Sequence, residues 1–203
     1  MQIRYLVFAS LLFLGIPATA QQLRFDNTLV LTTSGGLGYA NPGFVYRAGV
    51  EVEGTRAVIR ASGGFGSARK LETGDGWVRR FRADSYFKVR KLLIGGGISG
   101  SKLTTSRWSK GSVHPLIGAG IQNSRARAIV AYMLPGTDDQ NGVRGVDVQL
   151  RLQISKRVAF NPEISMLRYY STGRPDLPRK FGIAAGIGFT YSFGHTGFDG
   201  PPR

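Results

Sequence analysis

Ser112 and His114 are the two side chains whose types and spacing could supply a nucleophile and its general base. Residues two apart in a β-strand point to the same face, so a hydroxyl and an imidazole at this spacing can meet. A hydrolytic site of this kind also needs a third group that orients the imidazole, and no such group is evident in the sequence. We therefore expect no catalytic residues in this chain.

Two further segments resemble binding motifs but lack the residues that such motifs require. Gly95, Gly97 and Gly100 match a dinucleotide-binding glycine pattern. No helical pattern follows them, and the next acidic residue is Asp138, so the pattern does not indicate a nucleotide site. The segment 135–142 is rich in oxygen ligands but lacks the residue order of an EF-hand loop, and the chain's two histidines have no partner at metal-ligand spacing. The sequence thus indicates no cofactor and no metal site.

The composition excludes several other classes of protein. The 203 residues include no cysteine, so a disulfide framework, a zinc-thiolate site and a thiol nucleophile are excluded. With 42% hydrophobic and 19% charged residues the chain is too apolar for a disordered protein. Its 29 glycines argue against a mainly helical fold. A net charge of +15 favours anionic partners.

Residues 1–20 have the layout of a secretory signal peptide. Arg4 supplies a positive charge, and the apolar run from Tyr5 to Ile16 is shorter than the about 20 residues of a membrane-spanning helix. Ala18-Thr19-Ala20 matches a small-x-small cleavage site, so the mature chain is expected to begin at Gln21. An exported chain meets phosphate-bearing lipids rather than nucleic acid, and we therefore expect no nucleic-acid partner.

The mature chain alternates apolar and polar residues with a period of two, which is typical of β-strands with one apolar face. The alternation is unbroken from Val146 to Ile154, and it recurs over 44–53 and 181–193. No segment after residue 20 shows a helical stripe. With Gly, Pro, Asn and Asp clusters taken as turns, ten strands are predicted. They cover 25–34, 43–53, 55–67, 76–90, 92–104, 113–122, 125–134, 143–154, 157–170 and 180–193.

The predicted connections between strands alternate in length. Short turns are expected around Gly54, Lys91, Asn123 with Ser124, and Lys156, and longer polar loops lie between them. If consecutive strands form hairpins, all short turns lie at one end of the sheet and all long loops at the other. Bacterial outer-membrane barrels have this layout, with short periplasmic turns and longer external loops.

Residue types predict which face of the barrel is outward. The apolar faces carry bulky aromatic and branched residues, whereas the polar faces combine Gly and Ser with charges of both signs that can pair in a narrow interior. A closed barrel also leaves no unpaired strand edge in hydrocarbon. His114 is then expected at a strand end near the lipid headgroups. The expected lumen charge network comprises Arg47, Glu51, Arg60, Arg80, Arg82, Asp84, Asp147, Arg151 and Glu163.

Three segments resemble the small outer-membrane β-barrels of the opacity-protein and OmpA-like kind. Val113–Ile121 is similar to the family's strand of aromatic or His, Pro, two apolar residues and Gly-Ala-Gly, and 91–97 resembles its other glycine-rich strands. Tyr191-Ser192-Phe193 is similar to the terminal aromatic ending, although 194–203 follow it here. The resemblance implies insertion into the outer membrane by the barrel-insertion machinery and a role without enzymatic activity.

The sequence therefore predicts an all-β, antiparallel up-and-down transmembrane β-barrel of about ten strands, with eight as the alternative count. Residues 1–20 form the signal peptide, 21–193 the barrel and 194–203 a short flexible tail. We expect a structural, adhesive or surface-interaction role, without a large open pore, in contact with outer-membrane lipids and lipopolysaccharide. The loop cations available for such contacts are Arg69, Lys70, Arg107, Lys110, Arg174, Arg179 and Lys180.

Other functions are left open by the same residues. A soluble periplasmic barrel would place the apolar face inside and could bind an apolar ligand there. A small channel or a lipid-modifying barrel enzyme would keep the apolar face outside. The oligomeric state is also left open.

Overall fold

A computed structural model describes residues 20–32, 43–68, 76–104, 106, 109–136, 141–171 and 180–193. Residues 1–19 of the predicted signal peptide and the predicted tail lie outside the described residues. Five of the predicted loop cations, Arg69, Lys70, Arg107, Arg174 and Arg179, also lie outside them. In the described part of the chain, no helix is long and apolar enough to cross a membrane.

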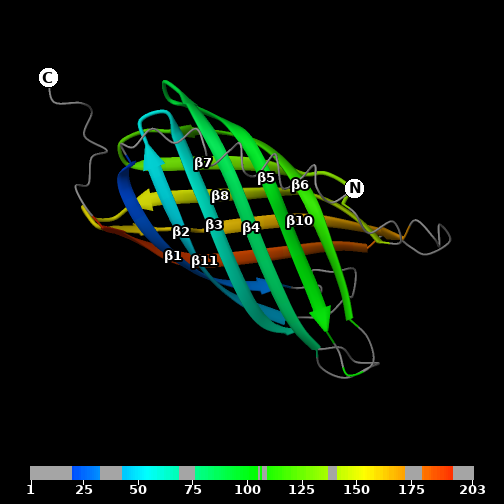
Figure 1. The fold of residues 1–203 in the computed structure, drawn as a ribbon. Helices are drawn as coiled ribbons and strands as arrows, with labels where there is room; N and C mark the ends of the chain where they lie inside the picture. The colour runs from blue at the N-terminus through cyan, green and yellow to red at the C-terminus, as the bar shows by residue number, and fades with distance from the viewer. Residues whose placement is uncertain are drawn as a thin grey trace, which may run out of the picture.

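The strands form one antiparallel sheet in which sequence neighbours pair and β1 also pairs with β11, so that the sheet closes into a barrel (Figure 1). Every pairing between strands is antiparallel, as predicted. The strands are β1 (Ala20–Thr32), β2 (Gly43–Gly54), β3 (Ala57–Ala68), β4 (Gly76–Val89), β5 (Leu92–Thr104), β6 (Ser109–Gln122), β7 (Ala126–Met133), β8 (Asn141–Gln153), β9 (Val158–Phe160), β10 (Glu163–Ser171) and β11 (Lys180–Phe193).

β9 and β10 are two parts of one barrel strand. Both pair with β8 and with β11. Phe160 lies opposite Leu152 and Glu163 opposite Gln149, so the register against β8 is unchanged from one part to the other. The interruption falls at Pro162, which has no N–H to donate to the ladder. The barrel therefore has ten strands, as predicted, and the alternative count of eight is wrong.

Two strands differ from their predicted bounds. β1 covers 20–32 rather than 25–34, because its backbone pairs with β2 from Ala20 onward although the polar residues there show no alternation. β6 begins at Ser109 rather than at residue 113, because Thr104 lies opposite Ser109 and the β5–β6 hairpin extends beyond its apolar part. Lys110 thus belongs to a strand and not to a loop, and Lys180 is the first residue of β11. Backbone pairing needs no apolar side chain, so hydropathy alone underestimated both strands.

The two faces of the barrel differ in chemistry as predicted. Outward side chains are large and apolar, and Trp77, Phe65 and Ile121 are 66%, 63% and 60% exposed. Inward side chains include Glu51, which is fully buried, and Asp84, which is 4% exposed. This arrangement is the reverse of the one that a soluble carrier of an apolar ligand requires.

Outward aromatic side chains gather near both ends of the strands. We call the end with the connections 55–56, 90–91, 123–125 and 154–157 the turn end, and the opposite end the loop end. At the turn end, Phe193 packs edge-on against Phe25 at 5.3 Å and against Tyr191 at 4.8 Å between ring centroids. The other exposed aromatic residues of this belt are Phe87 and Phe189, and the belt at the loop end comprises Phe44, Tyr46, Phe65, Trp77, Phe81 and Tyr132.

Candidate functional site: the lumen charge network

Glu51 of β2 is the centre of a buried charge cluster at the turn end of the lumen. Its Oε1 accepts hydrogen bonds from Arg24 Nη1 at 2.6 Å and from Arg151 Nη1 at 2.5 Å. Its Oε2 accepts a hydrogen bond from Arg127 Nη1 at 2.8 Å. These arginines come from β1, β8 and β7, and β7 lies across the ten-stranded barrel from β2. One carboxylate therefore connects opposite walls of the lumen.

Glu53 extends this cluster toward the turns. It accepts hydrogen bonds from Arg127 Nη2 at 2.6 Å and from Gln122 Nε2 at 2.7 Å, and it also pairs with Arg24 and Lys88. Gln122 in turn accepts a hydrogen bond from Arg127 Nε at 2.8 Å. The two carboxylates, Glu51 and Glu53, are thus shared among three arginines and a lysine, and this level of the lumen carries an excess of positive charge.

A second cluster occupies the middle of the lumen and is centred on Asp84 of β4. Arg60 binds Asp84 through two nitrogens, each at 2.7 Å, and Arg82 Nε binds the same carboxylate at 2.6 Å. Arg82 also pairs with Asp147 of β8, and Arg60 Nη1 donates to Gln149 Oε1 at 2.8 Å. Because β8 lies on the far side from β3 and β4, these contacts again cross the lumen.

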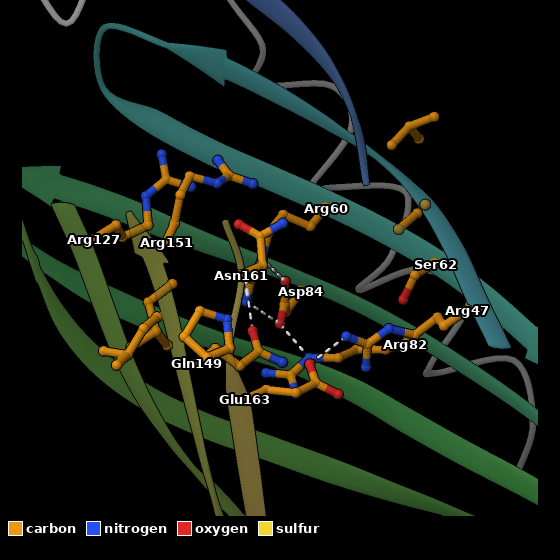
Figure 2. Close-up of a pocket in the computed structure, with 16 residues that line it drawn as sticks. Arg47, Arg60, Ser62, Arg82, Asp84, Arg127, Gln149, Arg151, Asn161 and Glu163 are labelled. Atoms are coloured by element: carbon orange, nitrogen blue, oxygen red, sulfur yellow. Dashed lines mark hydrogen bonds and ion pairs between the residues drawn. The ribbon is translucent and has the colours of Figure 1, made fainter. Parts of the chain in front are cut away.

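The space left between these side chains is small. Arg47 pairs with Glu163 on the loop side of the Asp84 cluster. Figure 2 shows Arg47, Arg60, Arg82 and Asp84 directed into a common space, which is a cavity of about 60 Å³. A cavity of this size holds only a few water molecules. Among the described residues no group of three or more His, Asp or Glu side chains is placed to hold a metal ion.

The structure places all nine predicted network residues on the inward face of their strands. Eight of them form ion pairs: Arg47, Glu51, Arg60, Arg82, Asp84, Asp147, Arg151 and Glu163. The ninth, Arg80, faces the lumen one step nearer the loop end than Arg82.

Sequence reasoning missed four members of the turn-end cluster. Lys88, Glu53 and Arg127 lay within predicted strands, at positions with the same parity as the predicted network, so parity alone could have identified them. Arg24 preceded the first predicted strand by one residue, and no signal in the sequence placed it inside the barrel.

Ser112 and His114 are in contact, as their spacing allows. His114 Nε2 lies 2.9 Å from Ser112 Oγ, and His114 Nδ1 lies 3.2 Å from the Leu134 carbonyl oxygen. The prediction that His114 lies near the lipid headgroups is wrong, because its position in β6 has inward parity and its side chain is only 4% exposed. The imidazole connects the loop end of β6 to the residue that follows β7.

Known proteins resemble this chain in structure and not in sequence. No protein-family model and no curated protein sequence matches it. The outer membrane protease OmpT from Escherichia coli superposes with a TM-score of 0.51 at 8% identity, over 88% of this chain and 99% of that chain. The translocator domain of autotransporter NalP from Neisseria meningitidis has a TM-score of 0.42 at 12% identity, over 94% of each chain. The outer membrane protein Ail from Yersinia pestis has a TM-score of 0.39 at 13% identity, over 85% of this chain and 99% of that chain. The predicted resemblance to outer-membrane barrels is confirmed at the level of the fold.

Proposed function

We propose that this chain is an outer-membrane β-barrel protein with a closed lumen and no enzymatic activity. The observation that carries the proposal is the outward surface, which is apolar and is bounded by an aromatic belt at each end. Outer-membrane barrels have an apolar band about 25 Å tall between two aromatic girdles. Closure of the sheet leaves no unpaired backbone edge, which hydrocarbon would not tolerate.

The charge network supports a closed lumen. About eight strands leave an interior that side chains just fill, whereas water-filled porins have about 16 to 18 strands. In this ten-stranded barrel, arginines reach across the interior to carboxylates on the opposite wall. Separating such buried pairs is costly, because each partner would remain charged and desolvated. The lumen is therefore a cross-braced interior, and its excess of arginine would make any residual leak selective for anions.

The proposed role is structural, adhesive or surface-interacting, and it is exercised through the loops. In this proposal residues 1–20 direct export, the insertion machinery places the barrel in the outer membrane, and the loop end faces outward. Loop cations would then meet lipopolysaccharide phosphates at the cell surface. The fold of the protease OmpT does not itself imply proteolysis, because one fold hosts many unrelated functions.

Membrane fractionation tests the location. The full chain, expressed in a Gram-negative host, should sediment with the outer membrane and resist extraction by alkaline carbonate. Unheated samples should migrate on denaturing gels at a different position from boiled ones, because a closed barrel withstands the detergent. Recovery in the soluble periplasmic fraction would contradict the proposal.

Conductance in planar bilayers tests the closed lumen. The wild-type protein should give at most small, irregular currents with weak anion selectivity. The double variant Arg60→Ala, Arg82→Ala removes two side chains that cross the lumen and should give larger, stable openings. A matched variant, Arg79→Ala, removes an outward cation from the same strand as Arg82 and should behave as wild type. Large single-level openings of the wild-type protein would identify a porin instead.

A further inference from the structure

Arg79 and Lys102 are the only charged side chains on the outward face of the strands, among the residues whose side chains the structure describes. Both are exposed, and they lie directly opposite each other in the β4–β5 pairing. No described carboxylate forms an ion pair with either of them. Like charges placed opposite each other across two strands repel. The pair therefore lacks within the described barrel the anion that would offset this repulsion.

The register of β3 to β6 gives the surface around this pair three rows. The row on the membrane side is apolar or small and consists of Gly63, Phe81, Gly100 and Val113. The middle row holds the two cations between Phe65 and Gly111. The row nearest the loops consists of Ser67, Trp77, Thr104 and Ser109, which offers three hydroxyl groups and an indole that is 66% exposed.

The local geometry leaves room against these rows. A Cβ atom built on Gly63 would have only the Arg80 carbonyl oxygen within reach, at 4.0 Å, so the surface above this glycine is open. The stem of Lys102 lies beside Gly111, where an added Cβ would be 3.5 Å from the Lys102 Cβ. A cavity of about 650 Å³ is lined by residues of the two lower rows, among them Phe65, Arg79 and Phe81.

The chemistry of the rows specifies a ligand. A phosphomonoester carries about −1.5 to −2 charges at pH 7, which matches two cations, whereas the phosphodiester of an ordinary phospholipid carries one. The apolar row suits acyl chains, and the row of hydroxyls with Trp77 suits a sugar. An acylated sugar that carries a phosphomonoester, as lipid A does, combines all three groups in the same order along the membrane normal.

We propose that Arg79 and Lys102 form a binding site for the phosphate of lipid A on the outer face of the barrel. The inference rests on the proposed function, because it requires the loop end to lie in the outer leaflet. In the site both cations contact one phosphate, acyl chains cover Gly63 and Val113, and the sugar lies against Trp77. The lipid thus supplies the anion that the barrel itself does not.

Native mass spectrometry of the full chain in a neutral maltoside detergent tests the site. Diphosphoryl lipid A, phosphatidylglycerol and inorganic phosphate are titrated separately. Wild-type protein should bind diphosphoryl lipid A more tightly than phosphatidylglycerol, and inorganic phosphate should not bind at the same concentrations. Arg79→Ala and Lys102→Ala should each weaken lipid A binding about fivefold or more, as expected for removal of one cation from a lipid phosphate.

Two further variants separate charge from folding. Arg79→Lys keeps the charge and should retain most of the affinity. Lys91→Ala removes an exposed cation from the turn of the same β4–β5 hairpin, at the opposite end of the barrel, and should bind as wild type. All variants are first shown to keep the gel mobility of the folded barrel.

The proposal is overturned if neither alanine variant weakens lipid A binding. It is also overturned if phosphatidylglycerol or inorganic phosphate binds as tightly with the same dependence on Arg79 and Lys102. Because the titration is done in micelles, it reports on the site independently of location. A barrel that fractionates with the outer membrane but binds lipid A equally in all variants refutes the site alone, whereas specific binding by a chain found outside that membrane refutes the location alone.

Discussion

The charges inside the barrel and the charges on its outer face are held in opposite ways. Inside, every carboxylate that the structure describes contacts an arginine, and Glu51 contacts three. Outside, Arg79 and Lys102 lie side by side with no described acidic partner. The strands carry both sets, so the difference arises from which face each residue occupies.

This contrast shows how solvent on each side determines the use of charge. The lumen is narrow and shielded, so a charge there is tolerated only when side chains of the barrel neutralise it. The outer face meets headgroups at the membrane edge, where a charge can be neutralised by a lipid. Inner charges therefore stabilise the barrel, and outer charges interact with its surroundings.

The largest expected effect comes from the centre of the inner network. Glu51→Gln keeps the shape of the side chain but leaves three buried arginines with one shared carboxylate fewer. We expect the free energy of unfolding to fall by about 3–5 kcal/mol, the usual cost of breaking a buried pair on one side. Urea titration of the refolded barrel, followed by tryptophan fluorescence, measures it. Glu163→Gln removes the partner of the half-buried Arg47 only and should cost clearly less; equal losses would mean that Glu51 is not the centre.

A second comparison examines the outer face at two depths. Ile98 lies in the middle of β5 and Leu92 at its turn end, and both point outward. Ile98→Arg should lower the free energy of unfolding in lipid bilayers by about 2–4 kcal/mol, and Leu92→Arg by only about 0–1 kcal/mol. The same urea titration in phospholipid vesicles gives both values. If depth makes no difference, hydrocarbon does not surround this face.

The smallest expected effect concerns the outer cations. In neutral detergent without anionic lipid, Arg79→Leu should raise the free energy of unfolding by about 0.2–1 kcal/mol, because it removes a like-charge cross-strand pair. Added salt should reduce this gain by screening the repulsion. Arg60→Leu, the matched inner variant, should instead destabilise the barrel because it leaves part of Asp84 uncompensated. A loss of stability for Arg79→Leu that persists at every salt concentration would show that Arg79 has a structural partner.

Hydropathy alternation was sufficient to identify most of the fold. It predicted ten strands, and β3, β4 and β5 lie within two residues of their predicted bounds at each end. It failed where strands extend past the apolar band, as at Ser109, because hydrogen bonding of the backbone continues in polar surroundings. Parity likewise predicted which charged residues face the lumen but not their partners. Glu51 and Arg151 are 100 positions apart, and only closure of the barrel brings them together.

The neighbours Arg79 and Arg80 show most clearly what each level of information decided. The sequence by itself determined that these two residues occupy opposite faces of a strand, because side chains alternate along any β-strand. Only the tertiary structure decided that Arg79 lies opposite Lys102 and that Arg24, Arg127 and Arg151 meet around Glu51. Alternation is a local property of the backbone, whereas register and closure depend on the pairing of all ten strands at once.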